Sequence, residues 1–148
     1  MLLSIYADVN INCPMLYFAE RYKYQNEKLS VYGYFLMQKT KISFGNCQES
    51  WGICHTSDIS YIFGLPLRSS FTGFFDSDRI LSENFIDAIG EFVHNGRIND
   101  AFNNQWKEAF TSESFNIETI ELKTNQYKMS RNIFEKRCKN FWYPKLFV

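Results

Sequence analysis

The stretch Val31-Tyr-Gly-Tyr-Phe-Leu-Met37 decides the fold that the sequence predicts. A continuous apolar run of this length is typical of a strand buried on both faces of a parallel sheet. Before it, Pro14 predicts the first turn of a helix, because proline is favoured there. After it, residues 39–50 are polar and predict a loop. A buried strand between a helix and a loop indicates an α/β protein.

Two further helices and a further strand are predicted towards the C-terminus. The first helix is capped by Asp76 or Ser77 and stopped by Asn95-Gly96. Its apolar residues, at helical spacing, are Leu81, Phe85, Ala88, Ile89 and Phe92. A short strand is expected around Phe115, Ile117, Ile120 and Leu122. Ser130 is expected to open the last helix. The side chains of this helix that are expected to face a core are Ile133, Phe134, Cys138, Phe141 and Trp142.

Only two good strands are therefore predicted. A sheet of two apolar strands leaves its faces and edges uncovered, which single domains avoid. The sequence thus predicts a single partial domain over residues 1–148, with a few sheet strands and packing helices.

The composition excludes several classes of protein. The chain has 148 residues, 45% of them hydrophobic, which indicates a globular protein. Sixteen basic residues balance sixteen acidic ones, so nucleic acid is not an expected partner. No apolar run approaches the ~20 residues of a transmembrane helix, and the N-terminus does not have the pattern of a signal peptide. Four cysteines favour an oxidising compartment.

The tract Trp51-Gly-Ile-Cys-His55-Thr-Ser-Asp58 contains one of only two histidines. The pKa of a histidine, about 6.5, suits proton transfer near neutral pH, although a lone histidine beside an apolar run is more often a core residue. A zinc site of Cys47, Cys54 and His55 lacks a fourth ligand at the usual spacing. A local triad of His55 with Ser57 and Asp58 is disfavoured, because the base must lie between its partners.

Five blocks, in order along the chain, resemble the type-B carboxylesterase and cholinesterase family of α/β-hydrolases. The blocks are the segment of Cys13-Pro14, the strand at residues 31–36, the tract 51–67 that ends in Gly-Leu-Pro-Leu, Phe92-Val-His94-Asn-Gly96, and Cys138-Lys-Asn-Phe141-Trp142 followed by Pro144-Lys-Leu146. The resemblance implies that the chain is the C-terminal portion of an α/β-hydrolase fold.

The resemblance also implies roles for single residues. His55 matches the general base of the Ser–Asp/Glu–His triad. Asp58 would hold the His55 loop or contact substrate, and Asp8 would buttress the site or be a solvated turn residue. His94 fits a cap at a helix C-terminus better than catalysis.

The four cysteines divide into two pairs. Cys13 and Cys138 match the ends of the family's last intrachain disulfide. Cys47 and Cys54 have no secure counterpart in the family, and form either a second bridge or two partly buried thiols. The resemblance places the full-length parent protein in a secreted or extracellular membrane-anchored setting.

The leading hypothesis is the histidine-bearing segment of a serine carboxylic-ester hydrolase, either a carboxylesterase or an acetylcholinesterase-like enzyme. No Gly-x-Ser-x-Gly motif occurs in the chain, so the chain alone is expected to be catalytically incompetent and its status as an enzyme is open. The alternatives are a non-catalytic cholinesterase-like adhesion domain of the neuroligin type and a truncated gene product. No cofactor or metal is expected, and the candidate partners are an ester substrate of the full-length parent and a homodimer through the C-terminal helix.

Overall fold

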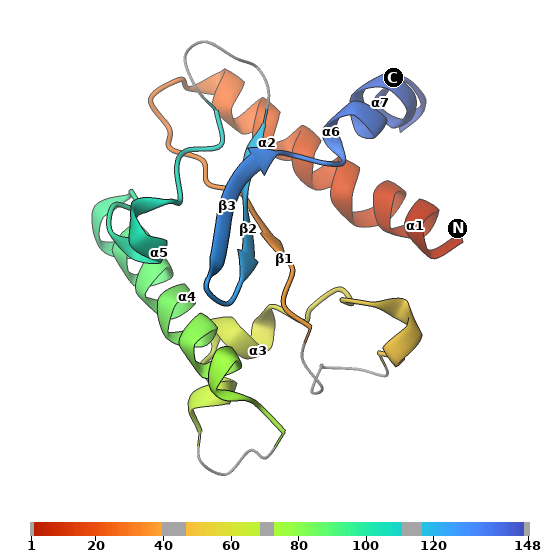
Figure 1. Cartoon of the computed structure of the whole chain (residues 1–148). Coiled ribbons are helices and arrows are strands. Elements are labelled where there is room, and N and C mark those ends of the chain that lie inside the picture. The colour runs from red at the N-terminus through yellow and green to blue at the C-terminus, as the bar shows by residue number, and fades with distance from the viewer. Residues whose placement is uncertain (1, 40–46, 69–72, 111–116, 147–148) are drawn as a thin grey trace. The chain divides into compact units, whose positions relative to one another are not determined.

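The structure, a computed structural model, describes residues 2–39, 47–68, 73–110 and 117–146. Contacts divide the chain into two compact units, each built from segments that are distant in sequence. Unit 1 comprises residues 1–33, 108–118 and 131–148, and unit 2 comprises residues 34–107 and 119–130. Helices and a small sheet occur together (Figure 1), in agreement with the α/β class expected from the sequence.

Unit 1 begins with an unbroken helix whose winding changes twice. The segment α1 (Leu2–Ala7) continues into a π-helical turn, η1 (Asp8–Asn12), and then into α2 (Cys13–Gln25). Pro14 has no N–H, and its ring clashes with the carbonyl four residues earlier in a regular α-helix. The wider π turn comes directly before this position, and in it the Cys13 N–H donates to the Asp8 carbonyl. The prediction from Pro14 therefore located the start of α2 but missed the helical turns before it.

A second helix in unit 1 repeats this arrangement. It consists of α6 (Glu135–Arg137), a π-helical turn η4 (Cys138–Trp142) and α7 (Tyr143–Leu146), and Pro144 follows the π turn. The predicted start at Ser130 is wrong. The Ser130 hydroxyl instead donates to Glu121 within the sheet (2.6 Å). The turn before the helix is held by Asn132, whose side-chain oxygen accepts a hydrogen bond from the Phe134 N–H (2.9 Å).

The core of unit 1 surrounds a disulfide between Cys13 and Cys138, whose Cα atoms lie 5.2 Å apart although 125 positions separate them in sequence. Both cysteines are completely buried. Packed with them are Leu16, Ala109 and Ile117. Two residues expected in this core are instead exposed, Ile133 at 60% and Phe141 at 49%, because the helix begins later and presents another face.

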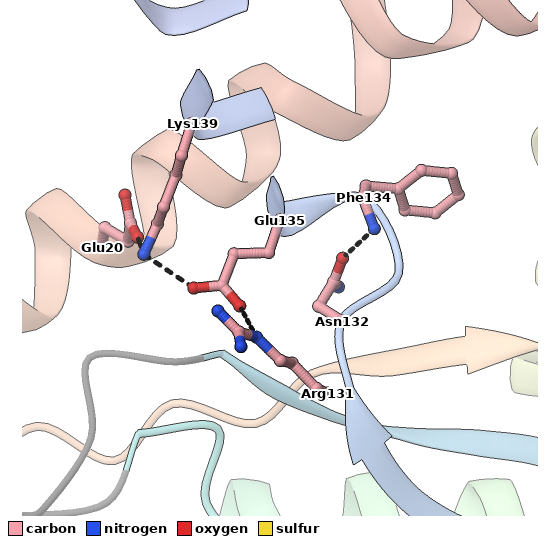
Figure 2. A network of polar contacts seen from close by, with 6 residues as sticks. All are labelled: Glu20, Arg131, Asn132, Phe134, Glu135 and Lys139. Atoms are coloured by element: carbon pink, nitrogen blue, oxygen red, sulfur yellow. Dashed lines mark hydrogen bonds and ion pairs between the residues drawn. The ribbon is translucent and has the colours of Figure 1, made fainter. Parts of the chain in front are cut away.

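A charged network joins α2 to the C-terminal helix of unit 1 (Figure 2). The Glu135 carboxylate is buried and accepts hydrogen bonds from Arg131 Nε (3.0 Å) and Lys139 Nζ (2.7 Å). Lys139 also pairs with Glu20 of α2 (2.6 Å). Burial alone would raise the pKa of Glu135, but the hydrogen bonds from Lys139 and Arg131 outweigh it and hold the pKa below its ordinary value.

The sheet has three strands in the order β1–β2–β3. β1 (Tyr34–Leu36) pairs in parallel with β2 (Glu118–Lys123), with Tyr34 opposite Ile120. β3 (Gln126–Arg131) follows β2 after a two-residue turn in which Asn125 has a φ of 57°. β1 is shorter than the predicted 31–37, since the Val31 carbonyl accepts a hydrogen bond from Ala109 within unit 1 instead (2.7 Å). β3 was not predicted.

Unit 2 places one long helix beside the sheet strands (Figure 1). α4 (Asp76–Asn95) buries Leu81, Phe85 and Ala88 at helical spacing, as predicted, whereas Phe92 is exposed. Gly96 ends α4 with a φ of 68°, also as predicted. The helix does not begin through a cap by Asp76 or Ser77, because the carboxylate of Asp78 accepts a hydrogen bond from the Phe75 N–H instead (2.9 Å).

Aromatic rings fill much of the core of unit 2. Their centroids lie 4.7–6.3 Å apart and most pairs are edge to face. This geometry stabilises aromatic pairs in addition to the burial of their apolar surface. The rings come from β1, α4, the short helix α5 (Ala101–Asn104), the segment after it, and β3. They belong to Tyr34, Phe85, Phe102, Trp106 and Tyr127.

Candidate functional site

His55 lies in a tight turn of unit 2, between Cys54 and the short helix α3 (Ile59–Ile62). The Ser57 N–H donates to the Cys54 carbonyl across this turn (3.2 Å), and Thr56 has a φ of 72°. A positive φ at the third position is typical of a type II turn. The His55 side chain is exposed, and the structure gives it no hydrogen bond to any described residue.

Asp58 ties the C-terminal side of this turn to the sheet. The Tyr34 hydroxyl, on β1, donates to the Asp58 carboxylate over 2.5 Å. Burial, and next the hydrogen bond to Asp58, raise the pKa of Tyr34 above its ordinary value. The Asp58 carbonyl accepts hydrogen bonds from the first turns of α3, from Tyr61 and Ile62 (3.0 Å each). The His55 turn is therefore attached to both β1 and α3.

A buried polar cluster fixes α3 to the beginning of α4. The Tyr61 hydroxyl donates to Asp78 (2.8 Å), and the Ser82 hydroxyl donates to the Tyr61 carbonyl (2.6 Å). Gln38, just after β1, also donates to Asp78 (3.2 Å). Sequence reasoning missed Tyr34, Tyr61 and Asp78 as supports of the His55 turn. The sequence offered one usable signal: Asp78 lies three residues after Phe75, where an acidic side chain can bond back to the start of a helix.

A second disulfide joins Cys47 to Cys54, immediately before His55. The two cysteines are seven residues apart in sequence, and their Cα atoms lie 6.1 Å apart. Of the two alternatives for this pair, the structure therefore contains the bridge. The zinc site that the sequence already disfavoured would also lack thiolate ligands, since both of its cysteines are bonded. Among the residues that the structure describes, no cluster of three or more His, Cys, Asp or Glu side chains could hold a metal ion.

Asp8 is a buried, bonded carboxylate of unit 1, so the solvated-turn alternative for it is wrong. Arg137 donates to it through two nitrogens, Nε and Nη2 (2.8 Å for Nη2), and Asn12 donates over 3.1 Å. Burial would raise the pKa of Asp8, but these hydrogen bonds, that of Arg137 above all, hold it below its ordinary value. This carboxylate joins the first and last helices of unit 1.

The second histidine, His94, is exposed in the last turn of α4, next to Gly96. A cation is favourable at that end of a helix. Ser57 is buried, and within the described residues it forms no hydrogen bond with the side chain of His55 or Asp58. A local triad of these three residues is therefore not assembled.

Comparison with known proteins shows the family of the chain. The model of the carboxylesterase family matches residues 1–142, and the chain therefore belongs to the carboxylesterase family. Over 146 residues the chain is 25% identical to acetylcholinesterase-1 of Trittame loki. That match covers 97% of this chain and 24% of the relative, so the chain spans about a quarter of the length of that protein. In the described part of the chain, no helix is both long and apolar enough to cross a membrane.

Proposed function

We propose that this chain supplies the general base, His55, of a serine carboxylic-ester hydrolase, as the C-terminal part of its α/β-hydrolase domain. The observation that carries the proposal is the position of His55, exposed on a turn that Asp58 attaches to β1. Family membership over residues 1–142 supports it. In an α/β-hydrolase the histidine follows the other two triad members along the chain, on a loop after a late strand.

The proposed chemistry needs a serine nucleophile in a Gly-x-Ser-x-Gly motif, which the 148 residues do not contain. His55 would take the proton of a serine during acylation, return it to the leaving alcohol, and then activate water in the same way. No Gly-x-Ser-x-Gly motif is present in the sequence, so the nucleophile, the acidic residue and the oxyanion hole would come from other residues. Asp58 and, in unit 1, Asp8 would hold structure rather than contact the ester.

A chimera tests this proposal directly. In it, this chain replaces the segment that it matches in acetylcholinesterase-1 of Trittame loki. We expect hydrolysis of a carboxylic ester such as p-nitrophenyl acetate, sensitive to a serine-directed organophosphate. His55→Ala should lower kcat by roughly three or more powers of ten, because proton transfer is lost from both half-reactions. The matched control His94→Ala should leave kcat unchanged.

The isolated chain provides the complementary measurement. Without a nucleophile and an oxyanion hole, it should hydrolyse the same ester no faster than an equal concentration of imidazole. Organophosphate-sensitive turnover by the isolated chain would contradict the proposal. A folded chimera that gives no hydrolysis, or equal losses from the two histidine variants, would favour the non-catalytic adhesion alternative.

An extracellular setting is part of the proposal. Two disulfides support it, since such bonds persist in oxidising compartments. A homodimer through the helix of residues 135–146 also stays a prediction, and sedimentation of the native protein would test it. Non-reducing mass mapping of the native protein should find both bridges, and free thiols at all four cysteines would contradict an extracellular setting.

A further inference from the structure

The Cys47–Cys54 disulfide closes a short loop on the surface of unit 2. Among the enclosed residues whose exposure is described, all are exposed, namely Gln48, Ser50, Trp51, Gly52 and Ile53. The loop holds the single turn η2 (Glu49–Trp51), with a hydrogen bond from the Trp51 N–H to the Gln48 carbonyl (2.9 Å). Gly52 has a φ of 82°. Packing therefore does little to fix this loop, and the disulfide is its main constraint.

The bridge ends at the residue that precedes His55. On the other side of the turn, Ser57 is buried and Asp58 is bonded to Tyr34. Only His55 and Thr56 thus lie between a covalent anchor at Cys54 and a packed anchor at Ser57. Without the covalent anchor, the described contacts of Cys54 are one backbone hydrogen bond, from the Ser57 N–H (3.2 Å), and the chain of an exposed loop.

We propose that the Cys47–Cys54 disulfide positions His55 for proton transfer. This inference rests on the proposed function of His55 as general base. The two cysteines are positioning residues and touch no substrate. A general base acts only within hydrogen-bond reach of the proton it takes, and a misplacement of about 1 Å can lower a rate by about a hundredfold. In an exposed turn, which packing does not hold in place, a covalent bond can keep the base within that reach.

The same geometry makes the two disulfides chemically distinguishable. Cys13 and Cys138 are completely buried, whereas Cys47 and Cys54 are partly exposed. Thiol–disulfide exchange requires a thiolate to reach a sulfur atom. A small dithiol should therefore reduce Cys47–Cys54 first. In that reaction two electrons and two protons pass to the pair, which becomes two thiols, and the dithiol closes to its own cyclic disulfide.

The first experiment measures the turn itself in the full 148-residue chain. Cys47→Ser combined with Cys54→Ser should speed hydrogen exchange of the Ser57 amide, which bonds to Cys54 across His55, by about tenfold or more. Amides of α4 should be unaffected. The control Ser50→Ala, inside the loop with the bridge intact, should leave the Ser57 rate unchanged. An unchanged Ser57 rate in the double variant would overturn the inference.

Mild reduction tests the same point without a substitution. Native chain treated with dithiothreitol and then alkylated should carry label at Cys47 and Cys54 only, by peptide mass mapping. The nuclear magnetic resonance signals of the His55 ring should shift in this species, while those of His94 stay in place. Reoxidation before alkylation should restore them. Equal shifts at both histidines would contradict a local positioning role.

A third experiment measures catalysis in the chimera. Per active site titrated with an organophosphate, the double cysteine variant should lose about tenfold or more in kcat, with KM changed by less than about twofold. A merely structural role would lower the number of active sites and leave kcat per site unchanged. If the unaltered chimera were inactive, the proposed function would fail, and the exchange measurement would still decide whether the bridge holds the turn.

Discussion

Tyr34 attaches the His55 turn to β1 through one hydrogen bond to a charged acceptor, Asp58. Tyr34→Phe keeps the ring, with its contacts to Phe85 and Trp106, and removes only this hydroxyl. Hydrogen bonds to charged groups contribute about 1.5–3 kcal/mol, so we expect a loss of that size in the free energy of unfolding, measured in urea. Tyr127→Phe is the matched control, because among the described residues its hydroxyl accepts one neutral hydrogen bond, from Asn84 (3.2 Å). A larger loss from the control would contradict this role of Tyr34.

Glu135 predicts a dependence of stability on pH in unit 1. Its pKa in the folded chain lies below the ordinary 4.5, because the hydrogen bonds from Lys139 and Arg131 exceed the effect of burial. The carboxylate therefore stabilises the fold above pH 4.5, and this contribution disappears as the pH falls through the lower folded pKa.

Glu135→Gln tests this dependence. At pH 7 the variant should lose about 1–3 kcal/mol of stability, because two cations keep only a neutral acceptor. Below the folded pKa of Glu135, its Tm should approach that of the unaltered chain. A difference in Tm that stays constant from pH 7 to pH 3 would show that the charge of Glu135 does not contribute.

At the scale of elements, two glycines at α4 allow the effect of backbone conformation on stability to be distinguished from the effect of packing. Neither Gly90, inside the helix, nor Gly96, which ends it, has any atom within 4 Å of an added Cβ. Only Gly96 has a positive φ, of 68°.

Gly96→Ala should therefore destabilise the chain by about 1 kcal/mol, since alanine is strained in the left-handed region. Gly90→Ala should stabilise it by roughly 0.5–1 kcal/mol, since alanine favours a helix interior. Thermal unfolding of the two variants should shift in opposite directions. A shift in the same direction would mean that space, and not backbone conformation, decides the effect at one of these positions.

Elements could be predicted from the sequence where their signal is local. The stop at Gly96 and the stripe of Leu81, Phe85 and Ala88 depend on residues within a few turns, and both are confirmed. The predicted helix start at Ser130 was wrong because a serine hydroxyl can cap a helix or bond within a sheet. Here it donates to Glu121 on β2. The helix before Pro14 was missed because a π turn that accommodates a proline leaves no clear pattern in sequence.

At the scale of the whole molecule, the sequence predicted His55 and, as a candidate support of its loop, Asp58, but not the partners that hold them. The resemblance predicts His55 as the general base, but the partner that holds its turn, Tyr34, is distant in sequence. Tyr34 and Asp58 are 24 residues apart. Asp8 and Arg137, which join the ends of unit 1, are 129 residues apart. Such pairs are set by tertiary packing, and no local pattern in one sequence specifies them.

The two disulfides constrain the unfolded chain to different extents, which yields a prediction for the whole molecule. Cys13–Cys138 spans 125 positions, and Cys47–Cys54 spans seven. In the chain-entropy description, the long loop stabilises by roughly 5 kcal/mol and the short one by about 2–3 kcal/mol. Replacing both cysteines of the long bridge by serine should therefore destabilise the chain more, and the loss of two buried sulfurs adds to the difference.

Hydrogen exchange at one buried residue of each unit checks this prediction. Loss of Cys13–Cys138 should lower protection mainly at Leu16 in unit 1, because the bridge joins the first and last helices of that unit. Loss of Cys47–Cys54 should leave Leu16 protected and act within unit 2. Little effect is expected at Phe85 in α4, since every enclosed residue whose exposure is described is exposed. If the short bridge proved as important for global stability as the long one, it would serve the core of unit 2 as a whole, and its effect on His55 would no longer be local.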